Sequence, residues 1–109
     1  MLKVCNIDIE HREEVYKRLR QFVRRLRKKF SIQEIYLFGS AARGELHEGS
    51  DLDVLIVGDF KGRIFDRIGE VLKLTDLPIE PLVYTPKEFE RLRSQNAFIK
   101  NIFRTGKKL

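Results

Sequence analysis

Residues 35–57, IYLFGSAARGELHEGSDLDVLIV, decide the fold of this chain. An apolar run that ends at Phe38 has the length and aromatic content of a β-strand, and it stops at Gly39. A second apolar run, residues 54–57, follows a polar connection and is typical of a strand that is buried on both faces. The stretch therefore predicts two neighbouring strands of one sheet.

The segment that follows the first run is interpreted as a phosphate site. Gly39-Ser40 opens the sequence GSAAR, which predicts that the strand turns into a short helix. The first N–H groups of a helix have no partner within the helix, and the helix dipole favours an anion there. Arg43 would lie one helical turn further on, where it either contacts a triphosphate or pairs with Glu45 or Glu48.

Asp51 and Asp53 indicate a metal site beside this turn. Residues two apart on a strand project to the same face, so the two carboxylates would lie together while Leu52 points into the core. Carboxylates bind Mg²⁺, which in turn binds nucleotide phosphates, as in-line displacement at phosphorus requires. Ser40 ends one strand and Asp51 begins the next, so these residues can meet only if the two strands are antiparallel.

Gly39-Ser40, ten intervening residues and Asp51-x-Asp53 resemble the GS-x10-D-x-D signature of the DNA polymerase β-like nucleotidyltransferase superfamily. The surrounding GSAARGE and SDLDVLIV, and TPKEFERLR…NAFIKNIFRTGK further on, are similar to its minimal nucleotidyltransferase (MNT) branch. The resemblance extends roughly from the first helix to the C-terminal helix. The family has a third carboxylate, commonly Asp, on a later strand, and Glu80 corresponds to it. The alternative for Glu80 is an exposed residue on an edge strand.

The resemblance implies a nucleotidyltransferase that uses two Mg²⁺ ions and ATP as substrate. The residues that it assigns are Asp51, Asp53 and Glu80 for catalysis and metal binding, and Gly39, Ser40 and Arg43 for nucleotide binding. Stand-alone family members are commonly paired with a HEPN-domain protein, as antitoxins that adenylylate a tyrosine of the HEPN ribonuclease. The resemblance therefore implies a HEPN toxin as acceptor and partner, in a homo- or hetero-oligomer.

The rest of the chain is predicted to support this site. An apolar stripe at helical spacing predicts a long first helix from Ile9 to about Phe30, with Lys and Arg on its other faces, while residues 1–8 are left unassigned. A second amphipathic helix is expected from Ile64 to near Asp76.

The last third of the chain predicts a strand and a helix. Residues 79–84 are expected to form the strand, and Pro81 favours a sheet edge because it has no N–H to donate. A capping box, Thr85 to Glu88, predicts a helix that continues to Gly106. We therefore expect a mixed α/β fold, with a small mixed sheet of three to four strands flanked by helices in the order α-β-α-β-α-β-α.

Length and composition suit one cytoplasmic domain over residues 1–109. The chain is 42% hydrophobic and 35% charged, without a secretory signal or a run near the roughly 20 apolar residues of a membrane helix. Its one cysteine, Cys5, predicts neither an internal disulfide nor a zinc site. A net charge of +6 suits an anionic partner, without choosing between nucleotide, RNA and an acidic protein surface.

Two other functions fit parts of the sequence. The chain could be a catalytically silent module that neutralises or anchors a partner, although the retained glycine, serine and carboxylates argue against a decayed site. It could also bind RNA through the basic first helix. The aromatic residues fall on predicted core stripes, so no stacking platform for bases is expected, and His47 is expected to be an exposed loop residue.

Overall fold

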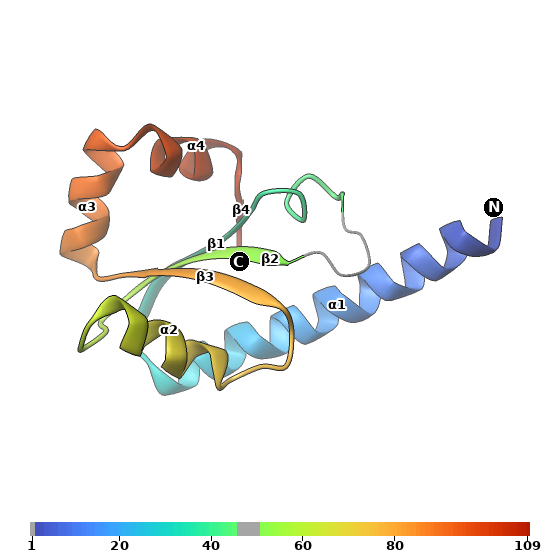
Figure 1. The fold of residues 1–109 in the computed structure, drawn as a ribbon, viewed down its shortest axis with the longest axis horizontal. Coiled ribbons are helices and arrows are strands. Elements are labelled where there is room, and N and C mark those ends of the chain that lie inside the picture. The colour runs from blue at the N-terminus through green and yellow to red at the C-terminus, as the bar shows by residue number, and fades with distance from the viewer. Residues whose placement is uncertain (1, 46–50) are drawn as a thin grey trace.

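Strand β2 (Leu52–Gly58) lies at the centre of a four-stranded sheet with the order β3-β2-β1-β4 (Figure 1). In the computed structural model, which describes residues 2–45 and 51–109, β2 pairs antiparallel with β1 (Ile32–Phe38) and parallel with β3 (Ile79–Tyr84). A short strand, β4 (Lys107–Lys108), pairs antiparallel with the other side of β1. The antiparallel pairing that the site requires is thus confirmed, as is the edge location of β3.

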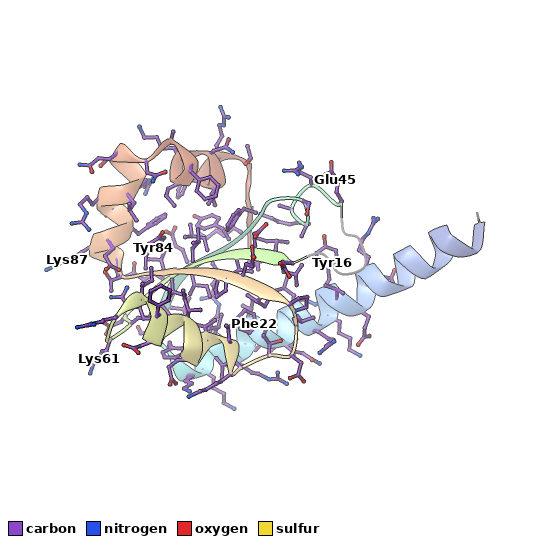
Figure 2. The ribbon with its side chains drawn as sticks, in the orientation of Figure 1. Tyr16, Phe22, Glu45, Lys61, Tyr84 and Lys87 are labelled. Atoms are coloured by element: carbon purple, nitrogen blue, oxygen red, sulfur yellow. The ribbon has the colours of Figure 1, made fainter. Side chains whose placement is uncertain are left out.

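Helices α1 (Leu2–Lys29) and α2 (Ile64–Leu72) cover one face of this sheet (Figure 1). The predicted stripe of α1 is buried against the sheet, and Figure 2 shows Phe22 pointing from α1 toward the strands. Leu52, Val54 and Ile56 of β2 face this layer. None of the helices within the described residues is long and apolar enough to cross a membrane.

Helices α3 (Pro86–Gln95) and α4 (Ala97–Thr105) cover the other face. Leu55 and Val57 of β2 pack there against Phe89 of α3 and against Ile99 and Ile102 of α4. Because both faces of β2 are covered, its residues 54–57 are all buried, as the unbroken apolar run predicted.

Three predicted helix boundaries are wrong. Helix α1 begins at Leu2, because extending an existing helix costs little even where the sequence has no apolar stripe. Helix α2 ends at Leu72, where a tighter turn from Leu74 N–H to the Val71 carbonyl follows. The last predicted helix is divided at Asn96, whose extended backbone ends α3 and whose side chain accepts hydrogen bonds from the first N–H groups of α4.

An ion pair joins helices from the two layers across the β3 edge. Arg67 Nη1 of α2 lies 2.6 Å from Glu88 Oε1 of α3, and the Arg67 side chain is only 10% exposed. The Glu88 carboxylate also accepts from the Thr85 N–H, which completes the predicted capping box. Hydrogen bonding from Arg67, followed by that from the Thr85 backbone, lowers the pKa of Glu88 below its ordinary value.

We predict that Glu88→Gln lowers the free energy of unfolding by about 1–2 kcal/mol at pH 7, because it removes a charged hydrogen-bonded pair. The pKa of Glu88 is lower in the folded protein than in the unfolded chain, where it is near 4.3. The stabilisation by this carboxylate is therefore fully present above the unfolded pKa. It is lost as the pH falls through the folded-state pKa of Glu88. Urea unfolding at pH 7 and pH 3 would test both points. The control is Glu90→Gln, which alters a 73%-exposed carboxylate of the same helix. An equal loss in the two variants at pH 7 would contradict the prediction.

Candidate functional site

Three strands bring one side chain each into a row at one end of the sheet. Phe38 of β1 is paired with Asp53 of β2, and Asp53 is paired with Glu80 of β3. Paired residues of neighbouring strands project to the same face, and the next row on that face contains Tyr36, which packs against α4. The predicted second and third carboxylates therefore lie side by side on the α3–α4 face of the sheet.

Negative charge is concentrated in this row. The Glu80 side chain is exposed, and its pKa is raised above the ordinary value by hydrogen bonding with Asp53 and then by the charges of Asp51 and Asp53. Asp51 is exposed just before β2 begins, and Asp53 is half-buried. All three predicted carboxylates are thus close enough to influence one another.

Gly39 allows this arrangement because it has no side chain. A Cβ atom at Gly39 would collide with Oδ2 of Asp53, and the backbone there has φ +72°, a conformation that L-residues with side chains rarely adopt. The glycine of the predicted phosphate turn therefore also makes room for the central carboxylate. From the sequence, Gly39 was expected only to let a phosphate approach the backbone closely.

Residues 39–44 form a series of turns rather than the predicted short helix. The Ser40 carbonyl accepts from the N–H groups of both Arg43 and Glu45, which closes the chain into a compact loop. Among the described residues, no backbone carbonyl accepts from the N–H groups of Ser40, Ala41 or Ala42. Consecutive N–H groups of a turn can bind an anion without a helix, so the prediction of a helix is wrong, while the turn still suits a phosphate by its chemistry.

Helix α1 contacts the turn of residues 39–44 through one side-chain hydrogen bond. The Tyr16 hydroxyl donates a 2.9 Å hydrogen bond to the Ala41 carbonyl, and Figure 2 places Tyr16 on α1, on the side that faces the sheet. This contact was not anticipated from the sequence, because Tyr16 lies next to the apolar stripe and 25 residues away from its acceptor.

Arg43 is exposed and lies 3.4 Å from Glu45, so the ion-pair alternative considered for it is present in the structure. A pair this exposed contributes little stability and can exchange for another anion, so it does not oppose nucleotide binding. His47 and Glu48 lie outside the described residues.

The carboxylates suit a hard cation by their chemistry. Oxygen donors are the ligands that Mg²⁺ prefers, and a divalent ion would offset the negative charges of Asp51 and Asp53, which, after hydrogen bonding with Asp53, raise the pKa of Glu80. Within the described residues, however, no three His, Cys, Asp or Glu side chains form a ready group of metal ligands. The carboxylates would therefore fit Mg²⁺ only as part of its ligand set, with phosphate oxygens and water supplying the rest.

Two cavities flank the row of carboxylates. One, of about 520 Å³, is lined by Asp53, Glu80 and apolar side chains of the β3 side, and the other, of about 290 Å³, contains Gly39 and Arg43. The Phe38 and Phe98 rings line both cavities, with an edge-to-face contact and centroids 5.8 Å apart. Phe98 is 55% exposed, so the expectation that all aromatic residues belong to core stripes is wrong.

Another cavity, of about 530 Å³, lies elsewhere, between α1 and the C-terminal residues. Arg20, Arg24, Arg27 and Lys107 surround it, and it contains none of the carboxylates. The candidate site is assigned by its chemistry rather than by cavity size.

Residues 19–108 match the family model of the nucleotidyltransferase domain. A protein of Methanocaldococcus jannaschii that is named provisionally as a protein adenylyltransferase is 33% identical over 96 residues, which cover 85% of this chain and 95% of that protein. Protein adenylyltransferase MntA of Thermococcus cleftensis is 37% identical over 65 residues, which cover 60% of this chain and 59% of that protein.

Solved structures agree with these relationships. A Sulfolobus solfataricus protein described provisionally as a nucleotidyltransferase superposes with a TM-score of 0.63 and 29% identity, over 77% of this chain and 78% of that one. A chain from a toxin–antitoxin structure with AMP-PNP gives a TM-score of 0.56 and 21% identity, over 82% of this chain and 69% of that one. At 21% identity, the similarity to the toxin–antitoxin chain shows only that the two chains share a fold.

We predict that Gly39→Ala lowers the free energy of unfolding more than Gly44→Ala does. Both glycines have a positive φ, +72° and +77°, but a Cβ at Gly44 meets nothing within 4 Å, so Gly44→Ala costs only the conformational term of about 1–2 kcal/mol. Gly39→Ala must also displace the Asp53 carboxylate. Urea unfolding would measure the difference, and adding Asp53→Ala to both proteins should bring the cost of Gly39→Ala down to that of Gly44→Ala. An unchanged excess in that background would show that Asp53 is not the obstacle.

Proposed function

This chain belongs to the nucleotidyltransferase domain family, and from that membership we propose that it transfers AMP from ATP to a hydroxyl group of a partner protein in the cytoplasm. The observation that carries the proposal is the row formed by Asp53 and Glu80, with Asp51 beside it and the Gly39-Ser40 turn at its end. These groups come from three separate segments of the chain, and they fit a reaction at phosphorus.

In the proposed reaction, the acceptor hydroxyl oxygen forms a bond to the α-phosphorus of ATP. The bond from that phosphorus to the bridging oxygen breaks, and pyrophosphate leaves with its electron pair. The proton of the hydroxyl passes to a nearby base. Glu80 is suited to this role because its carboxylate is exposed at the open side of the row, where an acceptor can approach.

The other candidate residues bind and orient the nucleotide. The turn at Gly39 and Ser40 would bind the β- and γ-phosphates through the Ser40 side chain and N–H groups of the turn, and Arg43 would leave Glu45 to contact the triphosphate. Asp51 and Asp53 would hold two Mg²⁺ ions, with Glu80 as a further ligand on the acceptor side. When bound, Mg²⁺ supplies charge stabilisation at the attacking and leaving oxygens.

The proposed acceptor is a tyrosine of a HEPN-domain toxin, which would make this chain an antitoxin. Two relatives bear the name protein adenylyltransferase, and the fold is shared with a chain of a toxin–antitoxin structure. Modification of a protein side chain is therefore favoured over modification of a small molecule or RNA.

We predict that Asp53→Asn reduces AMP transfer at least about 100-fold, because it removes a negative charge that orients the metal–phosphate complex. The assay follows label from [α-³²P]ATP into a co-purified HEPN partner, together with pyrophosphate release. The matched control is Asp59→Asn, which changes an exposed aspartate just beyond the far end of β2. Unchanged transfer by a correctly folded Asp53→Asn protein would refute the assignment, and label on RNA instead of protein would refute the acceptor.

A further inference from the structure

Tyr16 of α1 is hydrogen-bonded to the turn of residues 39–44, although it lies far from that turn in the sequence. Its hydroxyl donates to the Ala41 carbonyl over 2.9 Å. Among the described residues, no other side chain of a helix or strand is hydrogen-bonded to this turn. The contact therefore gives α1 one specific point of influence on the candidate phosphate turn.

We propose that Tyr16 is a positioning residue for nucleotide binding, which aims the N–H group of Ala42 at the phosphates of ATP. This inference rests on the proposed nucleotidyl transfer and deepens it. It adds a residue of α1 that lies outside the Gly39-Ser40 motif and that acts on the nucleotide only through the backbone of the turn.

The geometry of one peptide unit connects Tyr16 to the candidate site. The Ala41 carbonyl and the Ala42 N–H belong to the same peptide unit, which is planar and trans, so these two groups point in opposite directions. The carbonyl is held toward α1 by the Tyr16 hydroxyl. The Ala42 N–H therefore points away from α1.

The candidate nucleotide cavity lies on the side of the turn away from α1. The cavity of about 290 Å³ is lined by Ala42, Gly39 and Arg43, together with Phe98 and other residues of α4. Helix α4 covers the face of the sheet opposite to α1. Because no backbone carbonyl among the described residues accepts from the Ala42 N–H, this donor suits a phosphate oxygen in that cavity.

The surroundings of the hydroxyl favour a fixed orientation of the peptide unit. Tyr16 is half-buried against the core of the α1 layer, in which Ala41 is only 2% exposed. Within the described chain, the other donor to the Ala41 carbonyl is the Gly44 N–H, at 3.2 Å. Without the hydroxyl, this longer bond within the turn would be left to hold the carbonyl, so the Ala42 N–H would be less well oriented.

The alternative is that the Tyr16 hydroxyl only attaches α1 to the rest of the fold. The apolar stripe of α1 already provides that attachment, because four of its side chains are at most 8% exposed: Val15, Leu19, Phe22 and Leu26. Burial of four large apolar side chains stabilises the packing far more than one hydrogen bond does. Loss of the hydroxyl should therefore disturb the turn and leave the packing of α1 in place.

The first experiment measures nucleotide binding without catalysis, by isothermal titration with Mg²⁺ and α,β-methylene ATP, from which AMP cannot be transferred. Tyr16→Phe should raise the Kd about three- to tenfold, the effect of one lost hydrogen bond. The Kd for AMP should not change, because AMP lacks the phosphates that the turn would bind. Tyr16→Ala should weaken binding of the analogue at least as much as Tyr16→Phe does.

The matched control is Tyr36→Phe, which removes another hydroxyl, one that donates to Glu34 within β1 over 3.0 Å. This variant should bind α,β-methylene ATP like the unmodified protein. An unchanged Kd in Tyr16→Phe would overturn the inference, even if Tyr16→Ala binds weakly, because the ring and not the hydroxyl would then matter. Equal weakening by Tyr16→Phe and Tyr36→Phe would overturn it as well.

The second experiment locates the effect in the turn. At saturating α,β-methylene ATP, the ¹H–¹⁵N signal of the Ala42 amide should shift in the unmodified protein and shift clearly less in Tyr16→Phe, while the amide signals of α1 beyond Tyr16 stay in place. No shift at Ala42 in the unmodified protein would overturn the inference.

Kinetics of AMP transfer separate this inference from the proposed function. Tyr16→Phe should raise the KM for ATP by the same factor as the Kd and leave kcat within about twofold, since the hydroxyl acts on binding. If the analogue shifts the Ala42 amide in a Tyr16-dependent way but no transfer to any protein occurs, the proposed function fails while the positioning role stands. Transfer with an unchanged KM in Tyr16→Phe would remove the positioning role and leave the function intact.

Discussion

The approach of the Asp53 carboxylate to the bare backbone of Gly39 is the contact on which the site depends. It joins the end of β1 to the beginning of β2, and it leaves no room for a Cβ atom between them. The same glycine supplies the positive φ that starts the turn containing Ser40 and Arg43. One residue without a side chain therefore sets the position of both the carboxylate and the candidate phosphate turn.

The rest of the fold fixes that contact in place. Leu52 and Val54, on either side of Asp53, are buried against α1 and α2, so β2 cannot rotate about its axis without exposing them. The parallel pairing of β2 with β3 places Glu80 beside Asp53. The carboxylates repel one another, and the burial of the apolar residues around them maintains an arrangement that their own charges oppose.

The sequence predicted those parts of the structure that follow from local patterns. The strand built on the apolar run of residues 54–57, the pairing direction and the edge location of Pro81 follow from hydrophobic runs, spacing and the missing N–H. The division of the last helix depends on the Asn96 side chain, which caps α4 instead of continuing α3. The exposure of Phe98 could not be predicted, because an apolar residue at helical spacing is usually buried, and only the tertiary structure shows that the helices and strands among the described residues leave it exposed.

The distribution of charge separates the candidate site from the rest of the surface. The chain has a net charge of +6, yet the end of the sheet that carries Asp51, Asp53 and Glu80 is acidic, and the basic cavity along α1 contains none of these groups. A free triphosphate would be repelled by the carboxylates alone, so its binding requires cations there. Nucleotide binding at the acidic row, as proposed, would therefore depend on metal, whereas the apolar side chains that line the rest of the neighbouring cavity of about 520 Å³ carry no charge for a cation to offset.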